Sequence, residues 1–498
     1  MADSLESAPE IAPQYAEKIS EFDSLLNKEF KPKTDRAKSA VSAAVRTLAE
    51  QAVQATKLVP GDAVKAIEAM IAELDQKLTE QVNLIIHHEE FKSLEGSWRG
   101  LHHLVFNSET DEFLKIRVLN VSRKDITKDL QKNPGAKWDQ SELFKKVYTS
   151  EFSQLGGEPY GCLIGDYYFD HSPQDVELLD GIAKIAAAAH APFISAAAPT
   201  LMNMDTWQEL SKPRDLTKIF GTAEYAAWRS LRDSDNARYI GLTMPRYLAR
   251  LPYGAKTNPV EEFAFEEDVE GADHSKYVWS NSAFAMGVNI NRAFKLYGWC
   301  VCIRGVEGGG LVEGLPCHTF PTDDGGVDMK CPTEISIDDR REAELAKNGL
   351  MPLLHRKNAD TAVFMGAQSL NKPAEYEDED ATKNANLSAR LPYMFACCRF
   401  AHYLKAMVRD KVGSFKERAD MESWLNQWIT QYVTTDPSAS QEVKAKYPLA
   451  SAEVKVQEVP GNPGYYTSQF FLRPHYQLEG LSVSLRLVST LPSVKQGS

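Results

Sequence analysis

The chain has 498 residues, more than one typical domain, so we expect a large core and at least two packed units. Its 69 acidic residues outnumber the 56 basic ones and give a formal charge of −13, which disfavours nucleic acid as a partner. Seven cysteines, an odd number, argue against a disulfide framework and indicate a reducing, cytoplasmic compartment. No secretion signal opens the chain, and the alanine-rich run at 182–199 contains Lys184 and Pro192, so we expect no membrane insertion.

Residues 1–60 are predicted to form a mobile N-terminal arm, because they contain four prolines and few aliphatic side chains. Within the arm, apolar residues recur every three to four positions and predict one short amphipathic helix. Two interpretations are open: a helix docked on its own core, or a detachable peptide that another protein binds in a groove. The apolar residues of this helix are Tyr15, Ile19, Phe22, Leu25, Leu26 and Phe30.

Residues 61–110 are predicted to form a helical hairpin, because apolar residues follow Pro60-Gly61 at near-heptad spacing. Gly96 and Gly100 lie four residues apart inside the second helix, where each glycine costs about 1 kcal/mol relative to alanine. Small residues at this spacing allow another backbone to approach closely. We therefore interpret these glycines as a contact surface and Trp98 as a packing anchor beside it.

The middle of the chain alternates between helix-like and strand-like segments. The stretch 113–121, FLKIRVLNV, alternates apolar and basic residues and predicts a half-buried strand. The order of the segments predicts a mixed α/β fold, with a sheet flanked by helices. Helices are expected near 140–150, 174–190, 222–233, 281–296 and 338–347, and strands near 160–168, 193–198, 238–244, 299–304 and 333–337.

The C-terminal part is predicted to contain two helices followed by strands. Proline in the first turn starts a helix at Leu391, and Gly413 with a capping box at Ser414 separates it from the next helix. Regular strands near a chain end promote pairing with other chains. Strand residues on alternating positions are Val454 and Val456, then Tyr466, Ser468, Phe470 and Leu472, then Leu481, Val483, Leu485 and Leu487.

Catalytic motifs are not evident. The chain has no Gly-Lys dipeptide, so the phosphate loop of NTP hydrolases is excluded, and no Gly-x-Ser-x-Gly elbow is present. His88-Glu89-Glu90-Phe91-Lys92 has lysine where a zinc protease needs its second histidine. Cys300, Cys302 and Cys317-His318 do not have the spacing of a common zinc motif, so buried thiols are the favoured interpretation. We predict no catalytic residue, no cofactor and no metal.

Several stretches along the chain together resemble one family, the TssC/VipB family of large subunits of the type VI secretion contractile sheath. The resemblance covers roughly residues 60–495, and residues 1–60 match more loosely. The stretches are WRGLHHLV from Trp98, LNVSRKDI from Leu119, HAPFISAAAP from His190, RYIGLTMPRYLARLPY from Arg238, LPYMFACCRFAHYL from Leu391, GSFKERADMESWLNQWITQYV from Gly413 and RPHY from Arg473.

The resemblance implies a structural protein with a fold like that of phage tail-sheath proteins. Such a subunit pairs with a small sheath subunit of the TssB/VipA type and polymerises with other copies around a tube of Hcp hexamers on a baseplate. Contraction drives the tube into a target cell, and a ClpV-type AAA+ unfoldase then recycles the sheath. The unfoldase of this family recognises an N-terminal helix, which here corresponds to Ile19, Phe22, Leu25 and Leu26.

The resemblance also implies roles for the other segments. The hairpin would pack against the small subunit, and the terminal strands would exchange with neighbouring protomers. We expect 111–300 to be a middle α/β domain on the outside of the sheath, and 301–498 to be an inner, tube-facing core. The residues expected to contact the small subunit are Ile71, Leu74, Leu78, Gly96, Trp98 and Gly100.

Two alternatives to a sheath subunit remain open. One is a soluble adaptor that binds an unfoldase through its arm without polymerising. The other is a metal or thiol enzyme that uses Cys162, His190 or the cysteine cluster at 300–318. Filaments would argue against the adaptor, and normal assembly of a metal-free Cys302→Ser variant would argue against the enzyme.

Overall fold

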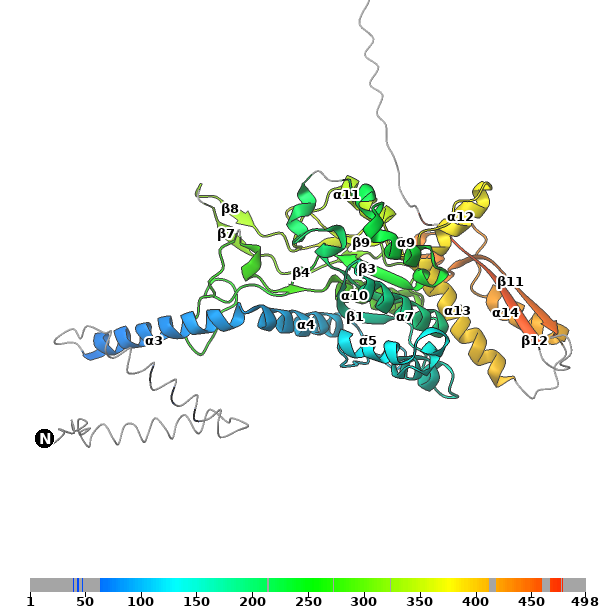
Figure 1. Ribbon diagram of the computed structural model, residues 1–498, viewed down its shortest axis with the longest axis horizontal. Coiled ribbons are helices and arrows are strands. Elements are labelled where there is room, and N and C mark those ends of the chain that lie inside the picture. Colours follow the sequence, from blue (N-terminus) through cyan, green and yellow to red (C-terminus); the bar gives the residue numbers. More distant parts are fainter. Residues whose placement is uncertain are drawn as a thin grey trace, which may run out of the picture. The chain divides into compact units, whose positions relative to one another are not determined.

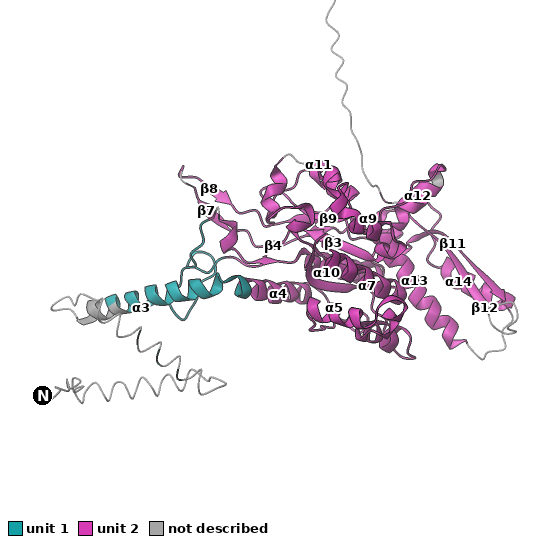
Figure 2. Cartoon of the chain, in the orientation of Figure 1, with its two compact units in different colours: residues 1–91, 252–270 teal, residues 92–251, 271–498 magenta. Residues whose placement is uncertain are grey.

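The computed structural model describes residues 63–212, 215–271, 273–322, 324–411, 418–458 and 466–475, together with residues 39, 43, 47 and 477. The chain divides into two compact units, which Figure 2 shows in different colours. The smaller unit contains residues 1–91 and 252–270, and the larger unit contains residues 92–251 and 271–498. The segment 252–270 is therefore an insertion that belongs with the N-terminal helix and not with its sequence neighbours.

In the smaller unit, helix α3 (Ala63–Ile86) is bound to the inserted segment through one amide side chain. Asn83 Nδ2 donates to the carbonyl oxygen of Glu266 at 3.1 Å, and Asp268 N donates back to Asn83 Oδ1 at 2.9 Å. His87 Nε2 lies 3.3 Å from the Glu267 carboxylate, which also accepts a hydrogen bond from Tyr253 N. These polar contacts fix the position of the insertion on the end of the helix.

The larger unit is built on a six-stranded sheet with the strand order β1-β2-β3-β9-β10-β6. Figure 1 labels β1, β3 and β9 of this sheet. The first four strands of this order are parallel, and β10 and β6 each pair antiparallel with their neighbours. Every residue of β2 and β3 is buried, as expected for parallel strands covered on both faces. The strands are β1 (Leu163–Phe169), β2 (Phe193–Ala197), β3 (Ile240–Met244), β6 (Leu311–Val312), β9 (Leu350–His355) and β10 (Ala362–Phe364).

Helices cover both faces of this sheet and give it two separate cores. One core gathers side chains from α5 (Arg123–Lys132), α7 (Pro173–Ala189), α8 (Leu216–Phe220), α9 (Ala226–Asp233) and α11 (Asp339–Lys347). The opposite core gathers side chains from α10 (Ser282–Tyr297) and the start of α13 (Leu391–Asp410). Adjacent residues of β2 divide between the two, with Phe193 in the first core and Ile194 in the second, because successive side chains of a strand point to opposite faces.

Local signals set the ends of the main helices. Ser172 caps α7 by accepting a hydrogen bond from Asp175 N, and Pro173 occupies the first turn. Asn281 caps α10 in the same way, and Gly298 ends that helix in the left-handed conformation, at φ 77°. Each cap satisfies backbone groups that have no partner inside the helix.

A third core joins the C-terminal elements. It packs Phe400 and Leu404 of α13 against Leu425 and Ile429 of α14 (Arg418–Thr430) and against the hairpin of β11 (Leu449–Glu458) and β12 (Tyr466–Pro474). The other elements are α4 (Glu89–Phe106), α6 (Glu142–Phe144) with the π-helix η2 (Lys145–Phe152), β4 (Tyr247–Leu248), β5 (Trp279–Ser280), β7 (Thr319–Pro321), β8 (Val327–Met329), α12 (Glu379–Ser388) and α15 (Gln441–Lys446).

The predicted mixed α/β fold is confirmed, as are all five helices predicted in the middle region and the strands near 160–168, 193–198 and 238–244. The strand predicted at 113–121 is wrong: the segment has no ladder partner among the described residues, and Phe113 and Val118 are exposed. The strands predicted near 299–304 and 333–337 are also wrong, apart from a single bridge at Thr333. The predicted domain boundary at residue 300 divides one six-stranded sheet. Strands β1, β2 and β3 precede residue 300 in the chain, and β6, β9 and β10 follow it.

Candidate assembly surfaces

The two glycines of α4 bring this helix into close contact with the rest of the larger unit. Gly96 and Gly100 are both buried. A Cβ atom at Gly96 would clash with the backbone carbonyl oxygen of Trp279, and one at Gly100 would clash with Phe284 and Ser280. The interpretation as a close-contact surface is therefore correct, but in the single chain the contact is with β5 and α10. The expectation that Gly96 and Gly100 also pack with the small subunit stays a prediction.

An ion pair holds the same face of α4. Glu95 accepts from Arg250 Nε and from Arg99 Nε, each at 2.7 Å, and the Arg250 side chain is almost fully buried. Burial alone would raise the pKa of Glu95, but the two guanidinium groups outweigh it and lower the pKa. The carboxylate therefore stays charged and fixes the helix against the segment that follows β4.

The opposite face of α4 presents apolar side chains to solvent. Leu94 is 57% exposed, Trp98 65% and Phe106 75%, and Val105 adds to the same surface. Side chains spaced by three, four and seven residues lie on one side of a helix. We call Leu94, Trp98, Val105 and Phe106 the α4 apolar stripe. Exposed aromatic and aliphatic residues gathered in one stripe are typical of a protein interface.

In α3, the predicted contact residues are accessible to different degrees. Ile71 is 52% exposed, whereas Leu74 and Leu78 are half-buried. Leu84 and Ile85 near the end of the helix are also exposed, at 70% and 57%, although they were not predicted as contacts. The smaller unit thus presents its own set of exposed aliphatic side chains.

The β11–β12 hairpin has the predicted alternation along β12. Ser468, Phe470 and Leu472 are half-buried, and the residues between them are exposed. Phe470 and Leu472 pack on the third core, so their side chains face the chain's own α13 and α14. The chain's own helices cover the apolar face of the hairpin. A strand of another chain could therefore pair with the hairpin only along a backbone edge.

Side chains of α14 already cover the backbone edge of β11. Asn426 Nδ2 donates to the carbonyl oxygen of Val454 at 2.8 Å, and Val454 N donates to Asn426 Oδ1 at 2.9 Å. Val456 N donates to Glu422 Oε2 at 2.8 Å. These bonds show that the polar backbone groups of Val454 and Val456 point away from β12. A strand from another chain cannot pair with this edge unless α14 moves.

The geometry of antiparallel pairing therefore places the open edge on β12. Val454 lies opposite Phe470, and Val456 lies opposite Ser468. Opposed residues in an antiparallel ladder either exchange both hydrogen bonds or exchange none. Because the backbone groups of Val454 and Val456 bind α14, those of Phe470 and Ser468 point outward. The described residues place no strand on this side of β12.

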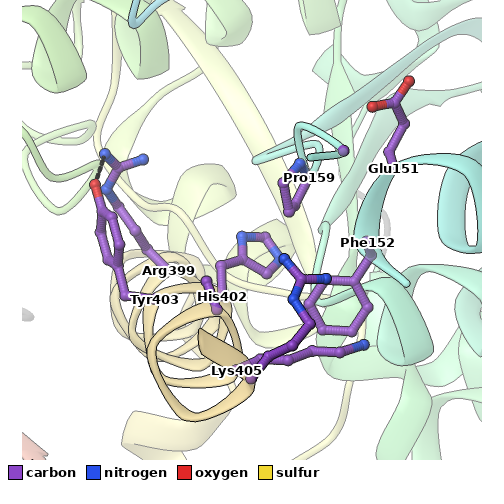
Figure 3. Close-up of a pocket in the computed structure, with 10 residues that line it drawn as sticks. Glu151, Phe152, Pro159, Arg399, His402, Tyr403 and Lys405 are labelled. Atoms are coloured by element: carbon purple, nitrogen blue, oxygen red, sulfur yellow. Dashed lines mark hydrogen bonds between the residues drawn. The ribbon is translucent and has the colours of Figure 1, made fainter. Parts of the chain in front are cut away.

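A basic pocket lies between the C-terminal half of α13 and the end of η2 (Figure 3). Lys405 Nζ lies 3.5 Å from the centroid of the Phe152 ring, a cation–π contact, and Arg409 donates to the carbonyl oxygen of Gln154 at 3.0 Å. The pocket has a volume of about 230 Å³. Its lining residues are Glu151, Phe152, Gly157, Pro159, Arg399, His402, Tyr403, Lys405, Ala406 and Arg409.

The charges of this basic pocket are not balanced by its one acidic residue. Glu151 accepts from Arg117 and from the backbone of Glu158, and Figure 3 shows its carboxylate pointing away from the basic side chains. The Nε atoms of Arg399 and Arg409 are buried and have no hydrogen-bond partner among the described residues. The pocket thus has the electrostatic character of a site for a carboxylate or another anion.

His402 does not add to the positive charge. Burial lowers its pKa to about 4, and its Nε2 atom lies 2.9 Å from the carbonyl oxygen of Ala189. The imidazole is therefore neutral near pH 7 and donates that hydrogen bond through Nε2–H. The charge of the pocket comes from the lysine and the two arginines.

Cys162, Cys300 and Cys302 of the enzyme alternative pack against one core, where their thiols are shielded from solvent. Burial raises the pKa of Cys162, Cys300 and Cys302, which makes these thiols poor nucleophiles. Burial also lowers the pKa of His190. Among the described residues, no group of three or more histidine, cysteine or acidic side chains is arranged to hold a metal ion. No described helix has both the length and the apolar character needed to cross a bilayer.

Several predicted site residues lie outside the described residues. They are Ile19, Phe22, Leu25 and Leu26 of the arm, the Gly413-Ser414 boundary, and Leu481, Val483, Leu485 and Leu487 of the last predicted strand. Sequence reasoning also missed the basic pocket. Its two halves, 151–159 and 399–409, are more than 200 residues apart in sequence, and neither carries a motif.

Two family models match the chain, and both describe tail-sheath domains. The VipB model, described as the EvpB/VC_A0108 tail sheath N-terminal domain, matches residues 68–371. The model of the EvpB/VC_A0108 tail sheath gpW/gp25-like domain matches residues 380–491. The chain therefore belongs to the class of tail-sheath proteins. Its six-stranded sheet lies in the first matched domain, and its β11–β12 hairpin lies in the second.

A curated relative gives the particular family. The chain is 71% identical over 481 residues to the type VI secretion system sheath protein TssC1 of Pseudomonas aeruginosa, with 96% of this chain and 97% of the relative covered. The chain belongs to the VipB family of type VI secretion sheath proteins, and it is a structural subunit of a contractile sheath.

Solved structures of contractile systems are more distant. A chain of the anti-feeding prophage baseplate matches with a TM-score of 0.34 and 10% identity, covering 63% of this chain and 66% of that one. A chain of an extracellular contractile injection system, the PVC sheath complex in the contracted state, matches with a TM-score of 0.33 and 10% identity, covering 62% and 67%.

Proposed function

We propose that this chain is the large sheath subunit that pairs with a small sheath subunit of the TssB/VipA type in the bacterial cytoplasm. The heterodimers polymerise helically around an Hcp tube on a baseplate, and contraction propels the tube into a target cell. The observation that carries the proposal is the 71% identity to a type VI sheath protein over nearly the whole chain. A structural role of this kind needs no catalytic residue in the chain.

The exposed apolar side chains support a stable partner. The α4 apolar stripe and the exposed aliphatic residues of α3 would otherwise remain in contact with water. Burying apolar surface contributes roughly 25 cal/mol per Å². We propose that the small subunit packs on Gly96, Trp98 and Gly100 of the larger unit. We propose that it also contacts Ile71, Leu74 and Leu78 of the smaller unit.

Two further parts of the proposal concern strand exchange and recycling. The open edge of β12, at Ser468, Phe470 and Leu472, suits β-augmentation by a strand of a neighbouring protomer. We propose that Leu481, Val483, Leu485 and Leu487 supply such a strand to another copy. We also propose that Ile19, Phe22, Leu25 and Leu26 form the helix that a ClpV-type AAA+ unfoldase recognises when it recycles the sheath.

Co-expression tests the assembly itself. The chain would be produced alone and together with its small partner, and both products would be imaged by negative-stain electron microscopy. We expect long hollow cylinders only in the co-expressed sample. Discrete particles in both samples would contradict the proposal and favour an adaptor.

Substitution of Trp98 tests the heterodimer surface. Trp98→Ala should weaken heterodimer binding by about 2 kcal/mol or more, because a central aromatic residue of an interface contributes on that scale. The unfolding temperature of the chain alone should change little, since Trp98 is 65% exposed. Co-purification and binding titration provide the measurement, and Ser93→Ala on the same helix is the control. Unchanged affinity of the Trp98 variant would place the small subunit elsewhere.

A further inference from the structure

The basic pocket of α13 concentrates positive charge on a chain whose formal charge is −13. Arg399, Lys405 and Arg409 face the same hollow, and their only acidic neighbour in the lining, Glu151, is bound to Arg117. Clustered cations repel one another and lose hydration in a hollow, which is unfavourable unless an anion occupies it. Aromatic rings and a backbone carbonyl oxygen contact these cations within the chain, but no carboxylate of the lining pairs with them.

An acidic segment of complementary charge lies elsewhere on the same unit. Residues 375–379 are all exposed and include Glu375, Glu377, Asp378 and Glu379. We call 375–379 the acidic loop. It precedes and begins α12, which is followed directly by α13, whose 20 residues correspond to about 30 Å of helix. Figure 1 shows α12 at the upper edge of the larger unit and the end of α13 at its lower edge.

We propose that the basic pocket of one copy of this chain binds the acidic loop of a neighbouring copy. The two surfaces are at separate places on the unit, so a contact made by one of them leaves the other available to a further copy. A contact between two different patches is head-to-tail, and when its rotation does not close into a ring it generates a helical filament. The inference rests on the proposed function, because it assumes that copies of this chain polymerise.

The chemistry of the two surfaces is matched. Guanidinium groups bind carboxylates through pairs of charge-assisted hydrogen bonds, and the hollow of about 230 Å³ offers such groups to the exposed glutamates of the acidic loop. Arg399, Lys405 and Arg409 all line the hollow, so their positive charge is what a carboxylate entering it would meet. Contacts of this type set register and partner choice more than total affinity. They therefore suit a contact that sets the register of neighbouring subunits in a polymer.

A charge-swap experiment tests this contact in co-expressed sheaths. The pocket variant is Lys405→Glu with Arg409→Glu, and the loop variant is Glu375→Lys with Glu377→Lys. The third variant combines all four changes, and Lys124→Glu with Lys137→Glu is the control for net charge elsewhere on the surface. The readouts are co-purification with the small subunit and the fraction of heterodimer that sediments as sheath.

We expect each single-sided variant to lower the sedimenting fraction by about tenfold or more, since like charges would then face each other. The combined variant should recover to within about threefold of the unmodified protein, and co-purification should be retained throughout. A pocket variant that assembles normally overturns the proposal. A second result also overturns the proposal: the pocket variant fails to assemble, the loop variant assembles normally, and the combined variant does not recover. That result would assign the pocket to another partner.

The loop variant keeps the test decisive if the pocket variant fails to fold. Its changes affect only exposed side chains, so normal sheath yield from the loop variant overturns the proposal by itself. Failure of the proposed function gives a different result: the unmodified chain and its partner would then form no sheath at all.

Discussion

At the scale of single residues, Gly96 and Gly100 show how a local cost is offset by a tertiary contact. Glycine inside a helix costs about 1 kcal/mol relative to alanine. In return, α4 approaches the backbone at Trp279 and the ring of Phe284 closely enough that Ser280 Oγ donates to the carbonyl oxygen of Gly96 at 2.9 Å. The glycines are therefore required by the fold of the chain before any partner is present.

The first prediction concerns these glycines. Gly96→Val should lower the free energy of unfolding of the chain by about 1–3 kcal/mol, because the new side chain meets a backbone carbonyl that cannot rotate away. Urea unfolding of the purified chain would measure it. Gly161→Val is the matched control, since nothing lies within 4 Å of a Cβ there. Equal stability of the two variants would show that α4 does not pack at Gly96 as described.

The second prediction concerns His402 and pH. Its pKa of about 4 lies below the usual 6.5, because burial disfavours the charged form. As the pH falls, His402 is therefore protonated in the unfolded chain at a higher pH than in the folded chain. The stability is fully present above about pH 6.5 and decreases toward pH 4, by at most roughly 3 kcal/mol at about 1.4 kcal/mol per pKa unit.

Replacing the imidazole tests this pH dependence. His402→Gln keeps an N–H donor for the carbonyl oxygen of Ala189 but does not titrate, so its unfolding free energy should fall less steeply between about pH 6.5 and pH 5. The exposed His88→Gln is the matched control for replacing an imidazole by an amide. An unchanged slope in the His402 variant would contradict the prediction.

At the scale of elements, the C-terminal hairpin has one closed edge and one open edge. Asn426 and Glu422 of α14 satisfy the backbone of β11, so that edge does not attract other strands. The outer edge of β12 has no such cover among the described residues. This asymmetry gives the hairpin a single direction in which a sheet can be extended across protomers.

The third prediction uses the two kinds of position along β12. Ser468→Pro removes an outward N–H group and should reduce sheath assembly while leaving the hairpin bonds intact, because proline is tolerated on an open edge. Gln469→Pro removes an inward N–H group and should instead destabilise the hairpin. Sedimentation of sheaths and thermal unfolding distinguish the two effects. Normal assembly of a folded Ser468 variant would contradict strand exchange at this edge.

At the scale of the whole molecule, the fold protects its thiols unequally. All seven cysteines are free, and none is exposed. Burial raises the pKa of Cys300 and Cys397 to about 11. Cys331 differs: burial opposes its ionisation, but hydrogen bonds with His355 and Thr333 outweigh burial and lower its pKa. Its surroundings therefore favour the thiolate, the reactive form, more than those of Cys300 and Cys397 do.

The fourth prediction follows from this difference. Iodoacetamide at neutral pH should modify Cys331 first in the native chain and the other cysteines only after unfolding, because the thiolate is the reactive form. Mass spectrometry of peptides after short exposure would identify the site. Cys331→Ser should leave the native chain largely unmodified. Rapid modification of Cys162 or Cys300 would mean that the core opens more readily than its packing indicates.

The sequence by itself determined the elements whose signals are local. The helices α7, α10 and α13 were predictable because caps, proline positions and apolar spacing act within a few residues. The alternation along β12 was predictable for the same reason. Family membership was also carried by the sequence, because many ordered matches spread along the chain do not depend on any one contact.

Only the tertiary structure decided which elements meet. Strand β9, which contains Pro352, was not among the predicted strands, and 113–121 was predicted as a strand although no described segment completes a ladder with it. The partner of the two glycines, the covered edge of β11 and the basic pocket likewise depend on residues far apart in sequence. The physical reason is that a helix satisfies its backbone within itself, whereas strand order, close contacts and pockets are chosen by which distant surfaces pack together.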